Sequence, residues 1–116
     1  MQMELLGAAR TVTGSATLLQ KESLKWLVDC GMHQGSRASD EKNRNVQPYH
    51  PEDLSFVLLT HAHIDHSGLI PKLVKEGFHG KIFCTKATFD LCEVMLRDSA
   101  HLQEMEAEWR NRKARR

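Results

Sequence analysis

Residues 61–66, with the sequence His-Ala-His-Ile-Asp-His, constrain the fold of this chain more than any other stretch. Four of the six side chains can bind a metal ion: His61, His63, Asp65 and His66. Imidazole nitrogens and a carboxylate oxygen suit Zn²⁺ or a similar first-row ion. Crowding these polar groups together gives no packing benefit, and removing them from water costs free energy unless something binds them. The stretch therefore predicts a metal site.

The flanking residues indicate where this site lies in the fold. An apolar run at residues 56–59 is typical of a buried strand. Residues 67–74 are typical of the start of a helix, which we expect to begin at residue 66 or 67 and to reach residue 76. In open α/β sheets, binding sites gather at the carboxyl ends of strands. A strand, a turn rich in ligands and a helix are therefore a suitable setting for a metal.

The spacing within the turn predicts how the ligands are divided. If the backbone stays near-extended, His61, His63 and Asp65 share one side, because a strand has a period of two residues, and His66 points differently. The turn would then serve two adjacent ions. His61 and His63 would hold one of them, and Asp65 and His66 the other.

Three further motifs accompany this turn along the chain. They are residues 7–15 (GAARTVTGS), 27–31 (LVDCG) and 85–88 (TKAT). The His-x-His-x-Asp-His pattern resembles the signature of the metallo-β-lactamase superfamily, whose hydrolases carry a dinuclear metal centre. The other three motifs are similar to those of its β-CASP branch, which contains RNA-processing nucleases. The likeness covers nearly the whole chain, and the six-residue signature is its most specific part.

The resemblance implies a fold, a reaction and a set of residue roles. The family fold is an αββα sandwich of two similar halves, and this α/β chain resembles the first half, a mixed sheet followed by a long C-terminal helix. The implied reaction is hydrolysis of RNA by a water that two metal ions activate, Zn²⁺ or alternatively Mn²⁺. Asp65 would be a ligand and the catalytic base. Asp29 would support the turn through hydrogen bonds without binding metal.

The ligand set is smaller than a dinuclear site requires. Each ion needs about three protein ligands besides an open or bridging water. The resemblance implies that a later His and a bridging Asp complete the site, and His79 and His101 match neither. We interpret His33 and His50 as structural or solvated histidines. We therefore expect residues 1–116 to be the N-terminal part of one metallo-β-lactamase domain, with little or no activity alone.

Length and composition limit the remaining possibilities. The chain has 116 residues and a net charge of +1, and this total says nothing about nucleic acid. No apolar run approaches the roughly 18 residues of a membrane-spanning helix, and the N-terminus does not resemble a secretory signal. The three cysteines form no Cys-x-x-Cys pair, which favours a reducing, cytoplasmic setting.

Hydrophobic patterning predicts the other elements. We expect strands at residues 4–7, 15–20, 24–29, 56–59 and 81–84. The short polar link at 21–23 predicts an antiparallel hairpin, and the strand, helix and strand of 56–84 predict a parallel pair. We expect residues 31–53 to be irregular apart from one helical turn that starts at residue 51. A single long helix should follow residue 86.

Two other functions remain open. A related hydrolase that cleaves a thioester or a lactam would carry the same His-Asp motif, although residues 7–15 and 85–88 favour the nuclease. A non-catalytic metal-binding or dimerising module would also fit an incomplete ligand set. A solvated helix end explains the basic residues 110–116, because two glutamates precede arginines at favourable i,i+4 spacing, and contact with RNA is the alternative.

Half of a sandwich would leave one apolar sheet face without a partner. We expect apolar residues at 18–19, 26–28 and 57–59 to line this face. At about 25 cal/mol per Å² of apolar surface, leaving several of them in water forfeits several kcal/mol. The long helix carries a second apolar stripe, formed by Leu91, Met95, Leu102, Met105 and Trp109. We therefore expect a homo-oligomer that buries the sheet face or this stripe.

Overall fold

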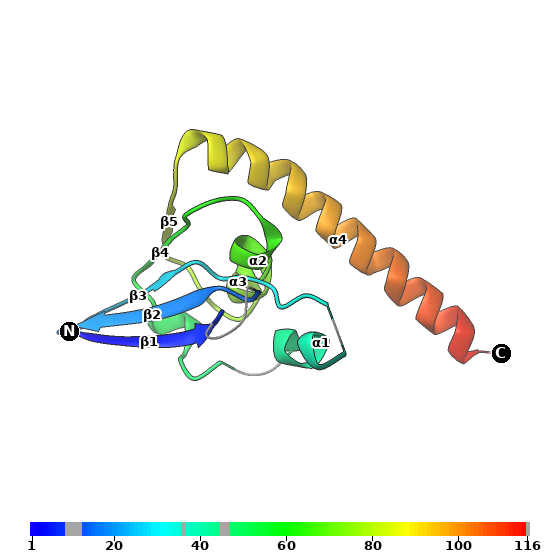
Figure 1. Cartoon of the computed structure of the whole chain (residues 1–116), viewed down its shortest axis with the longest axis horizontal. Coiled ribbons are helices and arrows are strands. Elements are labelled where there is room, and N and C mark those ends of the chain that lie inside the picture. Colours follow the sequence, from blue (N-terminus) through cyan, green and yellow to red (C-terminus); the bar gives the residue numbers. More distant parts are fainter. Residues whose placement is uncertain (9–12, 36, 45–46, 116) are drawn as a thin grey trace.

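The computed structural model describes residues 1–8, 13–35, 37–44 and 47–115. In this part of the chain one five-stranded sheet has the order β1-β2-β3-β4-β5 (Figure 1). The strands are β1 (Gln2–Gly7), β2 (Ala16–Lys21), β3 (Leu24–Val28), β4 (Phe56–Leu58) and β5 (Lys81–Phe83). The first three strands pair antiparallel, whereas β3–β4 and β4–β5 are parallel. The mixed sheet, the hairpin and the parallel pair are therefore confirmed.

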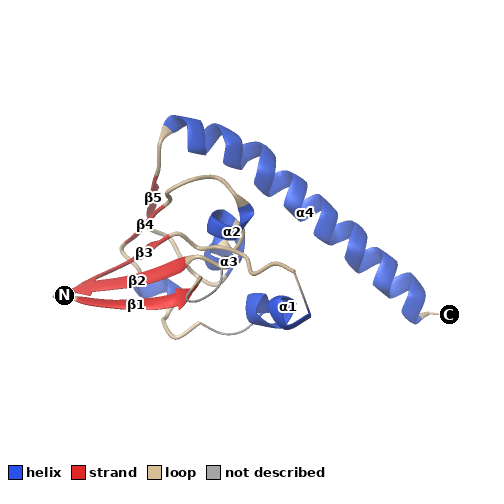
Figure 2. Cartoon of the chain, in the orientation of Figure 1, coloured by secondary structure: helices blue, strands red, loops and turns tan. Residues whose placement is uncertain are grey.

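The described helices are α1 (Arg37–Arg44), α2 (Ile64–Ser67), α3 (Ile70–Lys75) and α4 (Lys86–Ala114), with a short 3₁₀ turn η1 (Pro51–Asp53) (Figure 2). The long helix and the turn at Pro51 are confirmed. Thr85 is the N-cap of α4, and its hydroxyl oxygen accepts a hydrogen bond from the Thr88 backbone N–H at 3.2 Å. This cap explains why the TKAT motif begins the helix.

Two expectations about helices are wrong. Residues 37–44 form α1 instead of an irregular loop. Lys42 and Arg44 lie in its last turn, where positive charge interacts favourably with the helix dipole and stabilises the helix. The helix expected from residue 66 or 67 to 76 is two short helices, α2 and α3. Pro71 has no N–H to donate to the Ser67 carbonyl, so a continuous helix is disfavoured. Pro71 instead lies in the first turn of α3, where no such bond is needed.

The buried core lies on one face of the sheet. Leu18, Leu27 and Val57 are cross-strand neighbours on that face, and Leu27 and Val57 are completely buried. Side chains of the α2–α3 segment, including Leu69 and Leu73, belong to the same cluster. Truncating a core leucine of this kind costs about 2–5 kcal/mol. This packing holds the segment that carries the His-Asp turn against the sheet.

The opposite face of the sheet is apolar and largely open to solvent. Trp26 stacks on Phe56 at a ring-centroid distance of 5.4 Å, and Phe83 meets Phe56 edge-on at 5.8 Å. Strand alternation and pairing place the following side chains on this surface, which we call the open sheet face: Met3, Leu5, Leu19, Leu24, Trp26, Val28, Phe56, Leu58 and Phe83. Leu5 is 58% exposed and Phe83 is 50% exposed.

The expected residue set for this face is only half right. Leu18, Leu27 and Val57 face the core, whereas Leu19, Trp26 and Leu58 face outward. Consecutive residues of a strand point to opposite faces, so a run of adjacent apolar residues cannot line one face. The open sheet face is nevertheless apolar, because both sides of these strands carry hydrophobic side chains.

Helix α4 packs on the body through one narrow side. Thr88 and Cys92 are buried, and Leu96 contacts the core. The apolar stripe identified in the sequence lies mostly on the solvent side, with Leu102 56% and Trp109 57% exposed. In the described part of the chain, no helix combines the length and the apolar character needed to cross a membrane.

Candidate metal centre

The His-Asp turn begins just beyond the end of β4. Helix α2 starts at Ile64, and His63 is its N-cap residue. The His63 carbonyl accepts hydrogen bonds from the backbone N–H groups of His66 and Ser67 at 2.8 and 3.0 Å. The backbone therefore becomes helical after His63, so the condition of a near-extended path through Asp65 is not met. The helical turn brings His66 back toward His61.

The four motif side chains converge in space. His61, His63 and Asp65 each offer one ligand atom, and these atoms lie within 4.8 Å of one another. The His61 and His66 rings have centroids 3.8 Å apart, and the Asp65 Oδ2 lies 3.6 Å from the His66 Nε2. Asp65 therefore lies close to His61 and His63 and also to His66, and the division of the four ligands between two ions stays a prediction. His66 borders this group.

The buried Asp29 carboxylate contacts Thr60, just before the His-Asp turn, and His66 at its end. Asp29 follows β3 and is 3% exposed. Its Oδ1 accepts a hydrogen bond from the Thr60 backbone N–H at 2.8 Å, and its Oδ2 accepts one from the Thr60 hydroxyl at 2.7 Å. The same Oδ2 lies 2.7 Å from the His66 Nδ1. These contacts connect two loops through one buried carboxylate.

The contact between Asp29 and His66 sets the chemistry of the imidazole. With Nδ1–H donating to the carboxylate, the neutral ring carries its lone pair on Nε2, the atom nearer Asp65. A lone pair directed to the cluster is what a metal ligand requires. Asp29 itself has a φ of 65°, a left-handed conformation that Asp and Asn tolerate better than most residues.

Backbone hydrogen bonds fasten the turn to the other sequence motifs. The Ser15 N–H donates to the Asp65 carbonyl at 2.8 Å, and the Cys30 N–H donates to the His66 carbonyl at 2.8 Å. A Cβ at Gly31 would overlap the Asp65 carbonyl, so the chain passes too close for any side chain. The motifs 7–15 and 27–31 therefore meet the turn directly. Residues 9–12 of the first motif lie outside the described part.

Sequence reasoning missed two polar residues that shape the turn. Thr60 binds Asp29 through both its backbone N–H and its hydroxyl, and its Oγ1 lies 3.0 Å from the His61 Nδ1. Ser67 is completely buried, and its hydroxyl donates to the carbonyls of Ala62 and His63 at 2.9 and 3.1 Å. A polar residue immediately before and after the motif is the only sequence signal for these roles.

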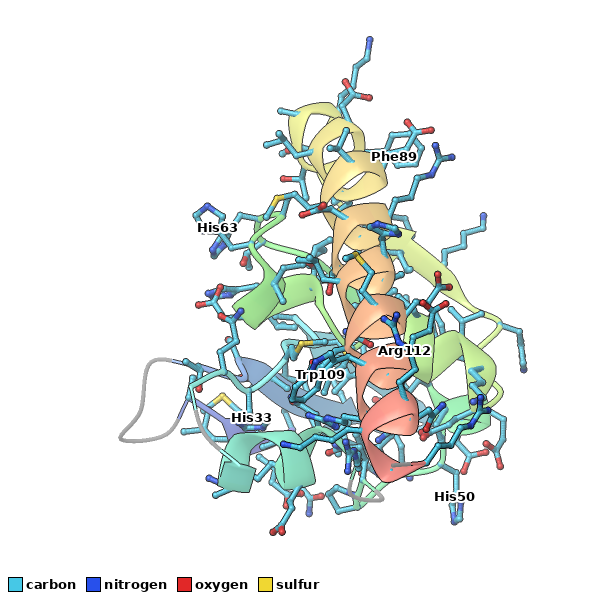
Figure 3. All side chains as sticks on the ribbon, turned by 90° about the vertical axis from the view of Figure 1, so that its right-hand side faces the viewer. His33, His50, His63, Phe89, Trp109 and Arg112 are labelled. Atoms are coloured by element: carbon cyan, nitrogen blue, oxygen red, sulfur yellow. The ribbon has the colours of Figure 1, made fainter. Side chains whose placement is uncertain are left out.

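His33 and His50 lie away from this cluster. Figure 3 shows His63 at a different edge of the molecule from His33 and His50. The His33 backbone N–H donates to the Asn43 Oδ1 at 2.6 Å, and the Asn43 Nδ2 donates to the His33 carbonyl at 2.8 Å. Burial lowers the pKa of His33, and Lys42 lowers it further. These contacts agree with a structural His33, and the side chain of His50 is 80% exposed.

Cys30 lies next to Asp29 but has the wrong chemistry for a metal ligand. It is 4% exposed, and burial raises the pKa of its thiol to about 12. A metal ligand must be the thiolate, which an apolar site disfavours. Cys30 therefore contributes packing and a backbone N–H to the site.

The mixed sheet and the His-Asp turn that follows β4 are the features expected of a metallo-β-lactamase domain. The family model of the metallo-β-lactamase superfamily matches residues 9–104, and the chain belongs to this superfamily. Among its curated relatives, Ribonuclease TTHA0252 of Thermus thermophilus is 44% identical over 106 residues, which are 90% of this chain and 24% of the relative.

Two other comparisons support the branch and the fold. Cleavage and polyadenylation specificity factor 73 of Drosophila melanogaster is 30% identical over 93% of this chain and 16% of its own length. These relatives belong to the β-CASP RNA-processing branch, so the resemblance is confirmed. Human tRNase Z, short form, shares the fold with a TM-score of 0.53 and 22% identity over 86% of this chain and 41% of that chain. The chain spans about a quarter or less of the curated relatives' length.

Proposed function

We propose that this chain is the N-terminal part of a metal-dependent hydrolase that cleaves RNA phosphodiester bonds. The observation that carries the proposal is the convergence of ligand atoms from His61, His63 and Asp65 within 4.8 Å. The relatives named as a ribonuclease and as a cleavage and polyadenylation factor support RNA as the substrate class. They favour the nuclease over a thioester or lactam hydrolase and over a non-catalytic module.

The residues of the turn fit Zn²⁺. Two ligand atoms that each lie about 2.1 Å from one zinc ion are at most about 4.2 Å apart. Ligand atoms within 4.8 Å of one another therefore need only small side-chain rotations to share an ion. His61, His63 and Asp65 would hold one ion, with His66 available to an adjacent second ion. Mn²⁺ is the alternative, because nitrogen and oxygen ligands also suit it.

The chain's own residues prepare the site for hydrolysis. A bound metal would act as a Lewis acid: it would make water a nucleophile near neutral pH and would stabilise negative charge on phosphoryl oxygens. Asp29 keeps the proton on the His66 Nδ1 and thereby leaves Nε2 free. The Asp65 carboxylate belongs to the cluster and is partly exposed, so it can take the proton of the attacking water.

The proposal includes a cellular setting and an assembly. Cys30, Cys84 and Cys92 are free thiols, which favours a reducing, cytoplasmic compartment. A homo-oligomer would cover the open sheet face or the apolar stripe of α4, since exposed apolar patches of this kind mark interaction sites.

Zinc binding provides the first test. A competition titration with a chromophoric chelator should show binding by the chain and a loss of tenfold or more for His63→Ala, because a ligand is removed. His50→Ala is the matched control, since that imidazole lies in an exposed loop. Equal zinc affinity for His63→Ala and the unaltered chain would contradict the site.

A chimera tests the reaction itself. The aligned region of this chain would replace the matching segment of Ribonuclease TTHA0252, to which it is 44% identical over 106 residues. We expect the chimera to cleave RNA with added Zn²⁺ or Mn²⁺, and His63→Ala to lower the rate by about tenfold or more. A chimera that folds and binds zinc but leaves RNA intact would contradict the proposed reaction. The 116-residue chain alone should show little cleavage.

A further inference from the structure

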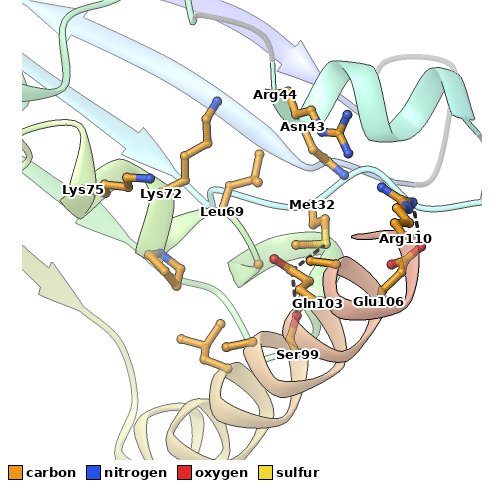
Figure 4. A pocket seen from close by; sticks show the side chains of 15 residues that line it. Met32, Asn43, Arg44, Leu69, Lys72, Lys75, Ser99, Gln103, Glu106 and Arg110 are labelled. Atoms are coloured by element: carbon orange, nitrogen blue, oxygen red, sulfur yellow. Dashed lines mark hydrogen bonds and ion pairs between the residues drawn. The ribbon is translucent and has the colours of Figure 1, made fainter. Parts of the chain in front are cut away.

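A groove of about 690 Å³ runs between α4 and the body of the molecule (Figure 4). One wall is the polar side of α4, which includes Ser99, Gln103 and Glu106. Helices α1 and α3 form the opposite wall. The apolar floor is short and includes Met32, Leu69 and Leu96. This groove is separate from the His-Asp cluster and has no part in the metal chemistry above.

Positive charge is concentrated in this groove. Its lining carries four cationic side chains and one carboxylate, an excess of three, whereas the whole chain has a net charge of +1. Lys72 pairs with Glu76 at 3.4 Å, and Arg110 pairs with Glu106 at 2.7 Å.

The other two cations stand on different helices. Arg44 belongs to α1 and Lys75 to α3. Among the side chains that the structure describes, which exclude that of Asp40, no carboxylate lies within ion-pair distance of either of them. Figure 4 shows Arg44 near Arg110 toward one end of the groove and Lys75 beside Lys72 toward the other. The groove therefore presents positive charge at both ends.

The groove adjoins the back of the His-Asp turn. The Met32 and Gly68 N–H groups both donate to the Ile64 carbonyl, at 2.9 and 2.8 Å. Ile64 lies between two candidate ligands, His63 and Asp65, and a Cβ at Gly68 would stand 2.7 Å from the Met32 Cβ. Two residues of the groove lining therefore contact Ile64, which is the chain neighbour of both His63 and Asp65.

We propose that this groove binds single-stranded RNA beside the candidate metal centre. The phosphates would lie along Arg44, Lys75 and Arg110, and a base would rest on the short apolar floor. This proposal rests on the proposed function for the identity of the anion. A polar α4 wall suits a hydrated sugar–phosphate backbone. An acidic amphipathic helix would instead need a long apolar floor, which the groove lacks.

Fluorescence anisotropy of the full 116-residue chain tests the proposal. The probe is a fluorescein-labelled oligouridine of about 12 nucleotides, in EDTA so that no cleavage occurs. We expect Arg44→Glu/Lys75→Glu to weaken binding by about tenfold or more and to reduce the salt slope by about two. Arg44→Gln/Lys75→Gln should give a smaller loss. Far-UV circular dichroism would establish that both double variants are folded.

A matched charge change provides the control. Lys21 and Lys81 are exposed and lie outside the groove, so Lys21→Glu/Lys81→Glu alters the net charge equally. We expect this pair to weaken binding only slightly. Equal losses for the two pairs, or no RNA binding by the unaltered chain, would overturn the proposal. So would tighter binding of a labelled polyglutamate peptide than of the RNA.

The two proposals fail in different ways. His63→Ala should leave RNA affinity in EDTA unchanged, because the groove lining does not include that residue. RNA binding that depends on the groove, together with an intact but inactive chimera, would retain the groove and reject the reaction. An active chimera with no effect of the groove variants would retain the reaction and reject the groove.

Discussion

The Asp29 Oδ2 lies 2.7 Å from the His66 Nδ1, although the two residues are 37 positions apart in the chain. Asp29 comes directly after β3, and His66 lies in the short helix that follows β4. These two strands pair in parallel, so their carboxyl ends meet at the same edge of the sheet. The buried carboxylate therefore joins two strand ends into one candidate site.

Replacing Asp29 with Asn should weaken metal binding more than it alters the fold. Asn tolerates the left-handed backbone at this position, but it carries no negative charge and only one acceptor oxygen. We expect zinc affinity to fall by about 10–100-fold, measured by competition with a chromophoric chelator. Asp53→Asn, at an exposed residue of η1, is the control. Unchanged affinity for Asp29→Asn would show that His66 does not need this partner.

Substituting Gly31 should damage the site through the backbone. A Cβ there overlaps the Asp65 carbonyl, so Gly31→Ala must displace the His-Asp turn. We expect a loss of about 1–3 kcal/mol in the free energy of unfolding, measured with urea, together with weaker zinc binding. Gly80→Ala also overpacks, with its Cβ 2.5 Å from the Ser55 carbonyl oxygen. It should lower stability but leave zinc affinity unchanged in the folded protein.

His33 should make stability sensitive to mild acid. Burial, with a smaller contribution from Lys42, lowers its pKa below 6.5 in the folded chain. The unfolded chain then binds the proton more tightly, so stability is complete above pH 6.5 and declines as the pH falls toward the folded pKa. An NMR titration of the ring should give a folded value below 6.5. Lys42→Gln should raise this value, whereas Lys86→Gln should not. A folded value at or above 6.5 would contradict the burial of the ring.

The open sheet face should drive self-association. Burying its aromatic cluster of Trp26, Phe56 and Phe83 in an interface lowers the free energy of the protein. We expect light scattering at micromolar concentration to show an oligomer, and Leu5→Lys/Leu24→Lys to yield the monomer. Leu102→Lys tests the apolar stripe of α4 in the same way. A clean, stable monomer of the unaltered chain would contradict the expectation of an oligomer through either surface.

Local patterns in the sequence were sufficient for the strands, the long helix and the candidate ligands, but not for α1 or for the break between α2 and α3. Alternating apolar residues, the short link at 21–23 and the capped entry to α4 predict the hairpin and the long helix, because these depend on neighbours in the chain. The motif at 61–66 predicts the candidate ligands, since no other stretch of the sequence combines imidazoles and a carboxylate so densely. The family resemblance added Asp29, whose partner lies too far along the chain for a local pattern.

The tertiary structure decided which of these residues meet. His66 borders His61 only because the chain turns helical at Ile64, and Gly31 matters only because the Asp65 carbonyl packs against it. Sequence periodicity shows that strands and α4 have apolar sides but not which side finds a partner. That choice depends on sheet register and helix packing, which are contacts between residues distant in the chain. For the same reason the cationic groove, built from three helices and a loop, has no local pattern in the sequence.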